Sequence, residues 1–300
     1  MSHGSIKGRV GFAIGTGRCG TRFLSSVIAR EPDVSSVHER NPLNEAFHRY
    51  CHWYRLPVDD DGFLYTKELE IQQDLKDHNF SFESSSHLSM SVRELYSRFE
   101  AKFILLVRSP ERVTNSHLRK GWYDEPIVYK NSKLALGYQQ SKGFQHFLGR
   151  IVPTEEKFLQ WNKMSRVGKL AWYWNAINAA VLDQFKDIPA THWRVEKIEE
   201  LSYDRYLELV HFFGFQSEIS QQVFDEIRLS RPNALPDVPT IASWNSSEVA
   251  EFETEVAPMA KKLGYEYRVD RLPLPELVSP SPEPQSVKGR IMKIFRHLKS

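Results

Sequence analysis

Cysteine, long apolar runs and net charge are all scarce in this sequence. Two cysteines in 300 residues are too few for a disulfide framework, and neither stands at the CxxC or CxxxH spacing of a structural zinc site. No run approaches the roughly 20 apolar residues that cross a bilayer, and the first eight residues lack the apolar core of a signal peptide. These absences predict a cytoplasmic protein without a metal.

Positive and negative charges nearly balance. The 40 Lys and Arg against 38 Asp and Glu leave a formal net charge of +2. No global field therefore favours nucleic acid, and we expect no nucleic-acid partner. Hydrophobic residues make up 41% of the chain, which is enough for a sizeable core. Composition alone allows one large α/β domain with insertions or two domains.

The C-terminal segments differ in composition from the rest. Residues 271–285 are rich in proline and predict an extended linker. Residues 286–300 carry five basic residues and no acid, with apolar residues on one helical face. Such a basic amphipathic helix suits an anionic membrane surface or a protein partner, and a solvated tail helix is the alternative. Residues 1–270 are expected to form a single α/β domain.

A glycine-rich loop near the start is the most informative stretch. The apolar run 10–14 predicts a buried strand, residues 15–21 (Gly-Thr-Gly-Arg-Cys-Gly-Thr) form the loop, and residues 22–29 predict a helix. This layout points backbone N–H groups at an anion and adds the positive end of the helix dipole. A Walker loop would place Lys and then Ser/Thr after the last glycine, but Thr21 and Arg22 stand there and the cation is Arg18. The loop predicts an anion cradle outside ordinary ATP hydrolysis, and a plain strand-to-helix turn is the alternative.

Further apolar segments predict a three-layer α/β fold with a central, mostly parallel sheet flanked by helices. Strands are expected within 33–39, 80–88, 102–107 and 191–195, and residues 102–107 have the continuous apolar pattern of a strand buried on both faces. Ligands of such sheets bind at the carboxyl ends of the strands. We therefore expect His38 and Glu39, at the end of the second strand, on the same edge as the loop.

The intervening segments are mostly helical. Residues 121–155 lack periodicity and are expected to form a lid or substrate loop. The acidic turn 59–61 lacks the alternating ligands of an EF-hand, so no metal is expected there. Helices are expected within 41–56, 92–99, 110–120, 156–186, 203–213, 218–227 and 247–263, the last ending at Gly264.

Three separated motifs occur in one order. The first is 18–23 (Arg-Cys-Gly-Thr-Arg-Phe), and the second is 104–108 (Ile-Leu-Leu-Val-Arg) with Ser116 eight residues later. The third is Ser243-Trp244, a helix of about 18 residues and then 263–265 (Leu-Gly-Tyr). Together they resemble the sulfotransferases that use 3′-phosphoadenosine 5′-phosphosulfate, over about residues 8–268. The carbohydrate-type or bacterial branch and the cytosolic branch both stay open.

The resemblance implies a P-loop-like sulfotransferase fold and a reaction. The sulfuryl group would pass by in-line displacement to a hydroxyl or amine of a small-molecule, lipid or carbohydrate acceptor, without a metal. Arg18 would be the catalytic cation at the bridging oxygen, and Arg108 with Ser116 would hold the 3′-phosphate, where the arginine fork suits phosphate oxygens. The nucleotide-binding residues implied in this way are Gly17, Arg18, Cys19, Gly20, Thr21, Arg22, Phe23, Arg108, Ser116 and Arg231.

The general base has three candidates. His87 resembles the base of the cytosolic branch, and Glu39 resembles the catalytic glutamate of carbohydrate-type and bacterial members. His38 is the third. An aromatic group is expected to cover the acceptor or to belong to the core, and it comprises Phe47, Tyr50, Trp53, Tyr54, Trp122 and Tyr123.

The sequence also departs from the family pattern. Arg22 replaces the usual second Thr or Ser of the loop, and Val195-Glu196-Lys197 stands where the cytosolic branch has Tyr-Glu-Asp. A P-loop small-molecule kinase and a non-catalytic nucleotide-binding module are therefore kept as alternatives. A homodimer is a further expectation.

Overall fold

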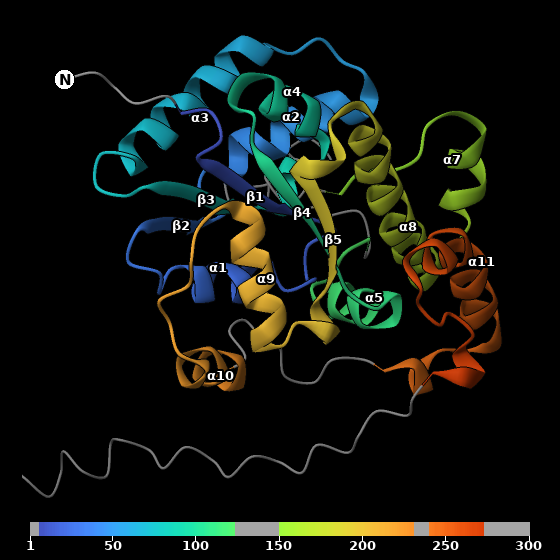
Figure 1. The fold of residues 1–300 in the computed structure, drawn as a ribbon. Helices are drawn as coiled ribbons and strands as arrows, with labels where there is room; N and C mark the ends of the chain where they lie inside the picture. Colours follow the sequence, from blue (N-terminus) through green and yellow to red (C-terminus); the bar gives the residue numbers. More distant parts are fainter. Residues whose placement is uncertain (1–5, 124–149, 231–239, 273–300) are drawn as a thin grey trace, which may run out of the picture.

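The centre of the protein is a parallel sheet of five strands in the order β2–β3–β1–β4–β5 (Figure 1). The structure, a computed structural model, describes residues 6–123, 150–230 and 240–272. All four neighbouring pairs run parallel, which confirms the expected α/β fold class. The strands are β1 (Val10–Ile14), β2 (Val34–His38), β3 (Phe80–Ser84), β4 (Lys102–Val107) and β5 (Trp193–Lys197).

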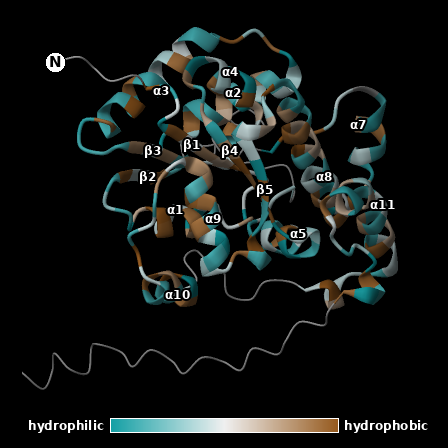
Figure 2. Cartoon of the chain, in the orientation of Figure 1, coloured by the Kyte–Doolittle hydropathy of each residue, from teal (hydrophilic) through white to brown (hydrophobic). Residues whose placement is uncertain are grey.

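The sheet is covered on both faces because its central strands are apolar on both faces. In β4, Phe103 and Leu105 belong to one hydrophobic cluster, and Ile104 and Leu106 belong to the other. Such strands fit only between two layers of helices. Figure 2 shows helices with hydrophobic and hydrophilic residues side by side, as expected for elements that bury one face.

Each face has its own helices (Figure 1). The cluster with Ile104 includes side chains of α1 (Thr21–Ile28), α9 (Tyr203–Phe213) and α10 (Gln221–Ser230). The cluster with Phe103 includes side chains of α3 (Asp60–Asp74), α4 (Val92–Phe99), α5 (Pro110–Arg119), α8 (Arg166–Gln184) and α11 (Ser246–Leu263). Two further helices are α2 (Pro42–Tyr54) and α7 (Glu155–Asn162).

Local capping defines the ends of α11. Asn245 accepts the backbone N–H groups of Ser247 and Glu248, and the Glu248 side chain accepts the Asn245 N–H, which completes a capping box. Gly264 ends the helix with φ +69°, the left-handed conformation that glycine adopts without strain. Both boundaries agree with the sequence expectation.

Most expected elements are confirmed, with small changes. The acidic turn is instead the start of α3, where the Asp59 carboxylate accepts the Gly62 N–H. Segment 156–186 is a helix pair, and the strand expected at 191–195 begins later, at Trp193. Arg231, most of the expected lid (124–149) and segment 273–300 lie outside the described residues. The proposed domain boundary near residue 270 stays a prediction.

Within the described ranges, no helix combines the length and apolar character that crossing a membrane requires.

Candidate functional site

The loop between β1 and α1 packs closely against the neighbouring strand. A Cβ on Gly15 would lie 2.5 Å from the Leu106 carbonyl oxygen, so only glycine allows this approach. Gly20 precedes α1 with φ +103°, and no side chain caps the first turn of the helix. That turn also carries no acidic residue. Its N–H groups and the positive end of the dipole are therefore suited to an anion.

Arg18 connects the loop to the second motif. Its Nε donates to Ser116 Oγ at 2.7 Å, across 98 residues of sequence. Arg108 follows β4, and its Nη1 donates to the Arg18 carbonyl oxygen at 3.1 Å. The Trp174 indole N–H in turn donates to the Arg108 carbonyl oxygen at 2.9 Å and holds this strand end in place. The structure thus brings both arginines and Ser116 together at one edge of the sheet.

Two guanidinium groups lie close together at this edge. Burial lowers the pKa of Arg18, and the positive charge of Arg108 lowers it further. Burial also lowers the pKa of Arg108. The negative charge of the nearby Glu199 carboxylate acts in the opposite direction. Two half-buried guanidinium groups in such proximity disfavour each other's charge, and an anion bound beside them would remove part of that cost.

The three candidate bases form one chain of contacts that begins at the loop. Thr21 Oγ1 lies 3.3 Å from His38 Nε2, and His38 Nδ1 lies 3.8 Å from Glu39 Oε2. Glu39 Oε1 lies 3.9 Å from His87 Nε2 and accepts the Ser86 hydroxyl at 3.3 Å. The ends of β1, β2 and β3 therefore present these side chains to one another, as expected for the carboxyl edge of a parallel sheet.

His38 is the weakest of the three as a base. Burial lowers its pKa to about 4, and the neighbouring positive charge of Arg22 lowers it further. At neutral pH its imidazole is uncharged and has little affinity for a proton. The Arg22 side chain is exposed, and its positive charge contributes to the lowered pKa of His38.

Backbone strain also marks this site. Arg18 and Glu39 have φ of +56° and +51°, a region that side chains other than glycine rarely adopt. In the described part of the chain three other non-glycine residues share this conformation, and Arg55 and Glu100 among them are ordinary C-caps of helices. Arg18 and Glu39 follow strands instead. Strain of this kind is typical of functional positions.

Two side chains of the first motif, Cys19 and Phe23, pack into the protein instead. Cys19 is fully buried, and burial raises the pKa of its thiol to about 11, so only its backbone is suited to an anion. The Phe23 ring packs edge-to-face on Phe224 of α10, with centroids 5.7 Å apart. Its expected contact with the nucleotide stays a prediction. Glu196, at the position of the missing Tyr-Glu-Asp segment, is buried in ion pairs with Arg194 and Arg205.

Two residues of this site, His117 and Arg49, were not predicted from the sequence. His117, next to Ser116, is buried and stacks on the Trp122 ring at 4.3 Å. Burial lowers its pKa to about 3, and the charges of Arg18, Arg49 and Arg150 act in the same direction. Arg49 of α2 is also buried and donates to the Ser86 carbonyl oxygen and to the Tyr173 hydroxyl. Neither residue belongs to a sequence motif, because each is placed at the site by contacts between segments that are distant in sequence.

The expected aromatic group is only partly assembled. Trp53, Tyr54, Trp122 and Tyr123 all pack on the same buried cluster around Tyr173. Trp53 Nε1 and the Tyr54 hydroxyl both donate to the Val152 carbonyl oxygen. Phe47 stays outside, 49% exposed. Four of these rings therefore have packing roles near the site.

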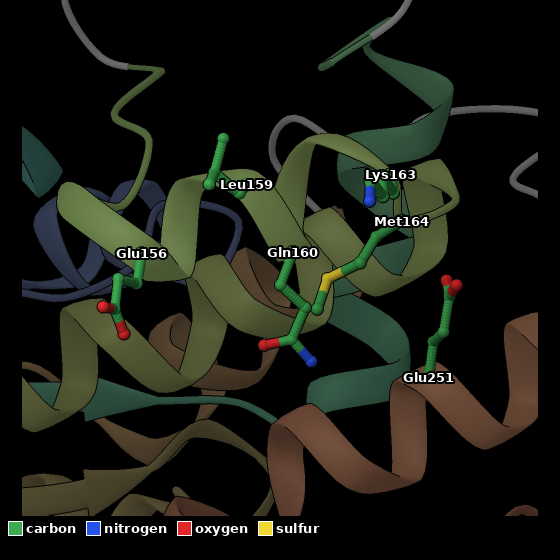
Figure 3. Close-up of a pocket in the computed structure, with 6 residues that line it drawn as sticks. All are labelled: Glu156, Leu159, Gln160, Lys163, Met164 and Glu251. Atoms are coloured by element: carbon green, nitrogen blue, oxygen red, sulfur yellow. The ribbon is translucent and has the colours of Figure 1, made fainter.

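Two hollows in the described part of the surface lie away from this site. One of about 500 Å³ is formed by α7, the turn after it and α11, and Figure 3 shows Met164 extending toward Gln160 while Leu159 points away from them. A second, of about 210 Å³, lies between α2 and α3 beside His48 and Phe63. Neither includes an expected nucleotide-binding residue. The residues that line the first are Glu156, Leu159, Gln160, Lys163, Met164 and Glu251.

Comparisons with known proteins give structural likeness alone. No family model and no curated protein sequence matches the chain. A sulfotransferase from Alicyclobacillus acidocaldarius is 15% identical, with a TM-score of 0.45 over 85% of this chain and 96% of that one. The sulfotransferase domain of the curacin biosynthetic pathway is 13% identical, with a TM-score of 0.48 over 87% and 99%. The sulfotransferase domain of an olefin synthase from Synechococcus PCC 7002 is 14% identical, with a TM-score of 0.43 over 88% and 95%. At these values the likeness carries no conclusion about substrate or chemistry.

Proposed function

We propose that this chain is a sulfotransferase that uses 3′-phosphoadenosine 5′-phosphosulfate as its donor. The acceptor would be a hydroxyl or amine of a small molecule, lipid or carbohydrate. The observation that carries the proposal is the meeting of Arg18, Ser116 and Arg108 at the glycine-rich loop, with Arg18 Nε 2.7 Å from Ser116 Oγ. A Walker loop has its cation after the last glycine, whereas here the cation lies inside the loop and contacts a second motif.

The residues present fit such a donor. The uncapped first turn of α1, together with Arg18 and Thr21, would bind the phosphosulfate end. Arg108 would bind the 3′-phosphate through its planar fork. Ser116 accepts from Arg18 and still has its own hydroxyl hydrogen to donate to a phosphate oxygen. Ser116 would therefore couple the two ends of the nucleotide site.

The donor supplies an activated sulfuryl group, and the protein positions the reactants and stabilises charge. The Arg18 guanidinium would stabilise the negative charge that develops on the leaving oxygen. The Glu39–His87 pair would accept the acceptor's proton, a contribution of roughly 10²- to 10⁴-fold. Because His87 Nε2 and Glu39 Oε1 lie 3.9 Å apart, the two side chains would act together on the acceptor.

A ligand comparison tests this function. In thermal denaturation of the full chain, 3′-phosphoadenosine 5′-phosphate should raise the melting temperature more than ATP with magnesium. Stabilisation by ATP–magnesium alone would contradict the proposal and support a kinase. Release of labelled sulfate from the donor, with water as the acceptor, gives a turnover readout before the acceptor is known. Tight nucleotide binding without sulfate release, and without transfer to any of a panel of phenols, lipid alcohols and sugars, would support a non-catalytic module.

A further inference from the structure

A second polar cluster lies at the start of α3. His48 and His52 are one turn apart on α2, and Asp60 is the first residue of α3. His48 Nε2 and His52 Nε2 each lie 2.8 Å from Asp60 Oδ1. The two imidazoles thus point the same ring nitrogen at one carboxylate oxygen. Among the described residues, these three side chains each offer a potential ligand atom, and the three atoms lie within 4.8 Å of one another.

We propose that His48, His52 and Asp60 bind a divalent transition-metal ion, with Zn²⁺ as the best match. Two histidines at positions i and i+4 lie on one helix face, the spacing that helical zinc sites use. Two imidazole nitrogens and one carboxylate oxygen form a donor set that Zn²⁺ accepts, and Mg²⁺ or Ca²⁺ would prefer oxygen ligands alone.

The observed separations are close to those of a zinc site. Bonds of about 2.0–2.1 Å at tetrahedral angles place ligand atoms about 3.3 Å apart. The two 2.8 Å contacts would therefore open by about 0.5 Å. His52 and Asp60 can make this change because their side chains are 22% and 47% exposed. That exposure also leaves a fourth position to water or a further ligand.

The outer contact of the His48 imidazole is the kind expected around a metal. His48 Nδ1 lies 3.0 Å from Ser91 Oγ, and His52 Nδ1 lies 3.8 Å from Glu94 Oε1. A ligating histidine usually donates its other N–H to an oxygen, as His48 can to Ser91, which fixes the ring and strengthens it as a ligand. The 3.8 Å separation at His52 is too long for a hydrogen bond and places Glu94 only as a nearby negative charge. The Phe63 ring stacks on His48 at 3.8 Å and further holds its orientation.

The ion would have a structural role next to the proposed active site. It would join α2 to the start of α3, and through Ser91 and Glu94 to the start of α4. Arg49 lies between the two histidines in sequence and donates to the Ser86 carbonyl oxygen. A metal at this point would therefore hold the helix that carries Arg49. The alternative is a metal-free hydrogen-bonded cluster, for which 2.8 Å is an ordinary distance.

A metal-uptake experiment distinguishes the proposed zinc site from a metal-free hydrogen-bonded cluster. Full-length, tag-free protein is treated with EDTA, exchanged into buffer, incubated with micromolar Zn²⁺ and passed through gel filtration before elemental analysis. We expect one equivalent of zinc per chain, and at least about a tenfold loss of affinity in both His52→Gln and Asp60→Asn. His211→Gln, an exposed histidine on α9, is the matched control and should bind as the wild type does.

Titration with Co²⁺ identifies the ligands. A visible absorption band without a strong near-ultraviolet thiolate band supports nitrogen and oxygen ligands. A thiolate band would assign the ion to Cys19 or Cys51 and overturn the proposal. Absence of retained zinc in the wild type, or equal zinc in His52→Gln and Asp60→Asn, would also overturn it. Asp60 is exposed enough that its variant should fold, and Glu94→Gln, a positioning residue, should weaken uptake without removing it.

Discussion

At the scale of single residues, Arg18 and Arg108 differ in what they contact. The Arg18 guanidinium is hydrogen-bonded to a side chain, Ser116, whereas Arg108 donates to the loop backbone. Arg18 lies inside the loop in a left-handed conformation, and Arg108 follows a regular strand. In the proposed function this difference separates their roles: Arg18 would act where charge develops, and Arg108 would act where the nucleotide is held.

Replacement of Arg18 should therefore lower turnover more than binding. Removal of one charge-stabilising donor costs roughly 10²–10³ in turnover. We expect Arg18→Ala to lose about that factor in sulfate release, while the affinity for 3′-phosphoadenosine 5′-phosphate changes much less. Arg98→Ala, an exposed arginine paired with Glu68, is the control. If Arg18→Ala and Arg98→Ala lost sulfate release to the same small extent, Arg18 would have no role in the mechanism.

His117 should make the protein sensitive to acid. Its pKa is lowered to about 3 in the fold and is near 6.5 when exposed, so below pH 6.5 the unfolded chain takes up a proton that the folded chain does not. Stability is complete above pH 6.5 and falls as the pH decreases toward 3. At pH 5 the loss from this group is on the order of 2 kcal/mol.

Urea denaturation at pH 7 and pH 5 measures this effect. His117→Phe keeps an aromatic ring against Trp122 but cannot take up the proton. Its free energy of unfolding should fall less between the two pH values than that of the wild type. His211→Gln should behave as the wild type, and an identical fall in His117→Phe would disprove the assignment.

At the scale of elements, the ends of β2 and β3 bring the two proposed base residues together. Glu39 follows β2, and His87 lies in the short 3-10 helix after β3. The register pairs His38 with Ser84, which brings the residues that follow the two strands alongside each other. The sequence left Glu39, His87 and His38 as alternative bases, and the 3.9 Å separation of Glu39 and His87 supports the proposal that these two act together.

If Glu39 and His87 act together, the losses of activity caused by substitutions at the two positions should not be additive. We expect Glu39→Gln and His87→Asn each to lower sulfuryl transfer by roughly 10²-fold or more, and the double variant to be about as slow as the slower single variant. His78→Gln, beyond α3, is the control. Losses that multiply in the double variant would show independent roles for the two residues.

A buried ionic cluster joins α2, α3 and β3. Lys67 Nζ lies 2.6 Å from Glu45, 2.9 Å from Glu83 and 2.9 Å from Glu70, and its side chain is 2% exposed. Carboxylates that are buried without their cation are costly. Lys67→Met should therefore lower the free energy of unfolding by roughly 3–5 kcal/mol. Urea denaturation measures this, with exposed Lys76→Met as a control, and a change below about 1 kcal/mol would contradict it.

The same cluster explains why the sequence did not reveal α3. Its inward face carries Phe63, Lys67, Ile71 and Asp74, so two of four buried positions are charged. Such a face has no apolar stripe for periodicity to detect. Helices with an ordinary apolar face, such as α4, were predicted with the bounds that the structure has.

At the scale of the whole molecule, the parallel sheet gathers the site. The loop, Glu39, His87 and Arg108 follow four different strands, and their carboxyl ends share one edge. Motif spacing identified Arg18, Ser116 and Arg108, which the structure brings together, and their role in nucleotide binding stays a prediction. Arg49 and His117 could not be predicted in this way, because their position depends on how α2 and α5 pack against Tyr173 and Trp122.

The proposed two-part nucleotide site is tested most directly by titration calorimetry with two nucleotides that differ only in the 3′-phosphate. The wild type should bind 3′-phosphoadenosine 5′-phosphate at least about tenfold more tightly than 5′-phosphoadenosine, since hydrogen bonds to charged groups contribute about 1.5–3 kcal/mol. Arg108→Ala should remove most of that preference, and Arg98→Ala should keep it. Equal affinities in the wild type, or a preference unchanged in Arg108→Ala, would contradict the proposed site.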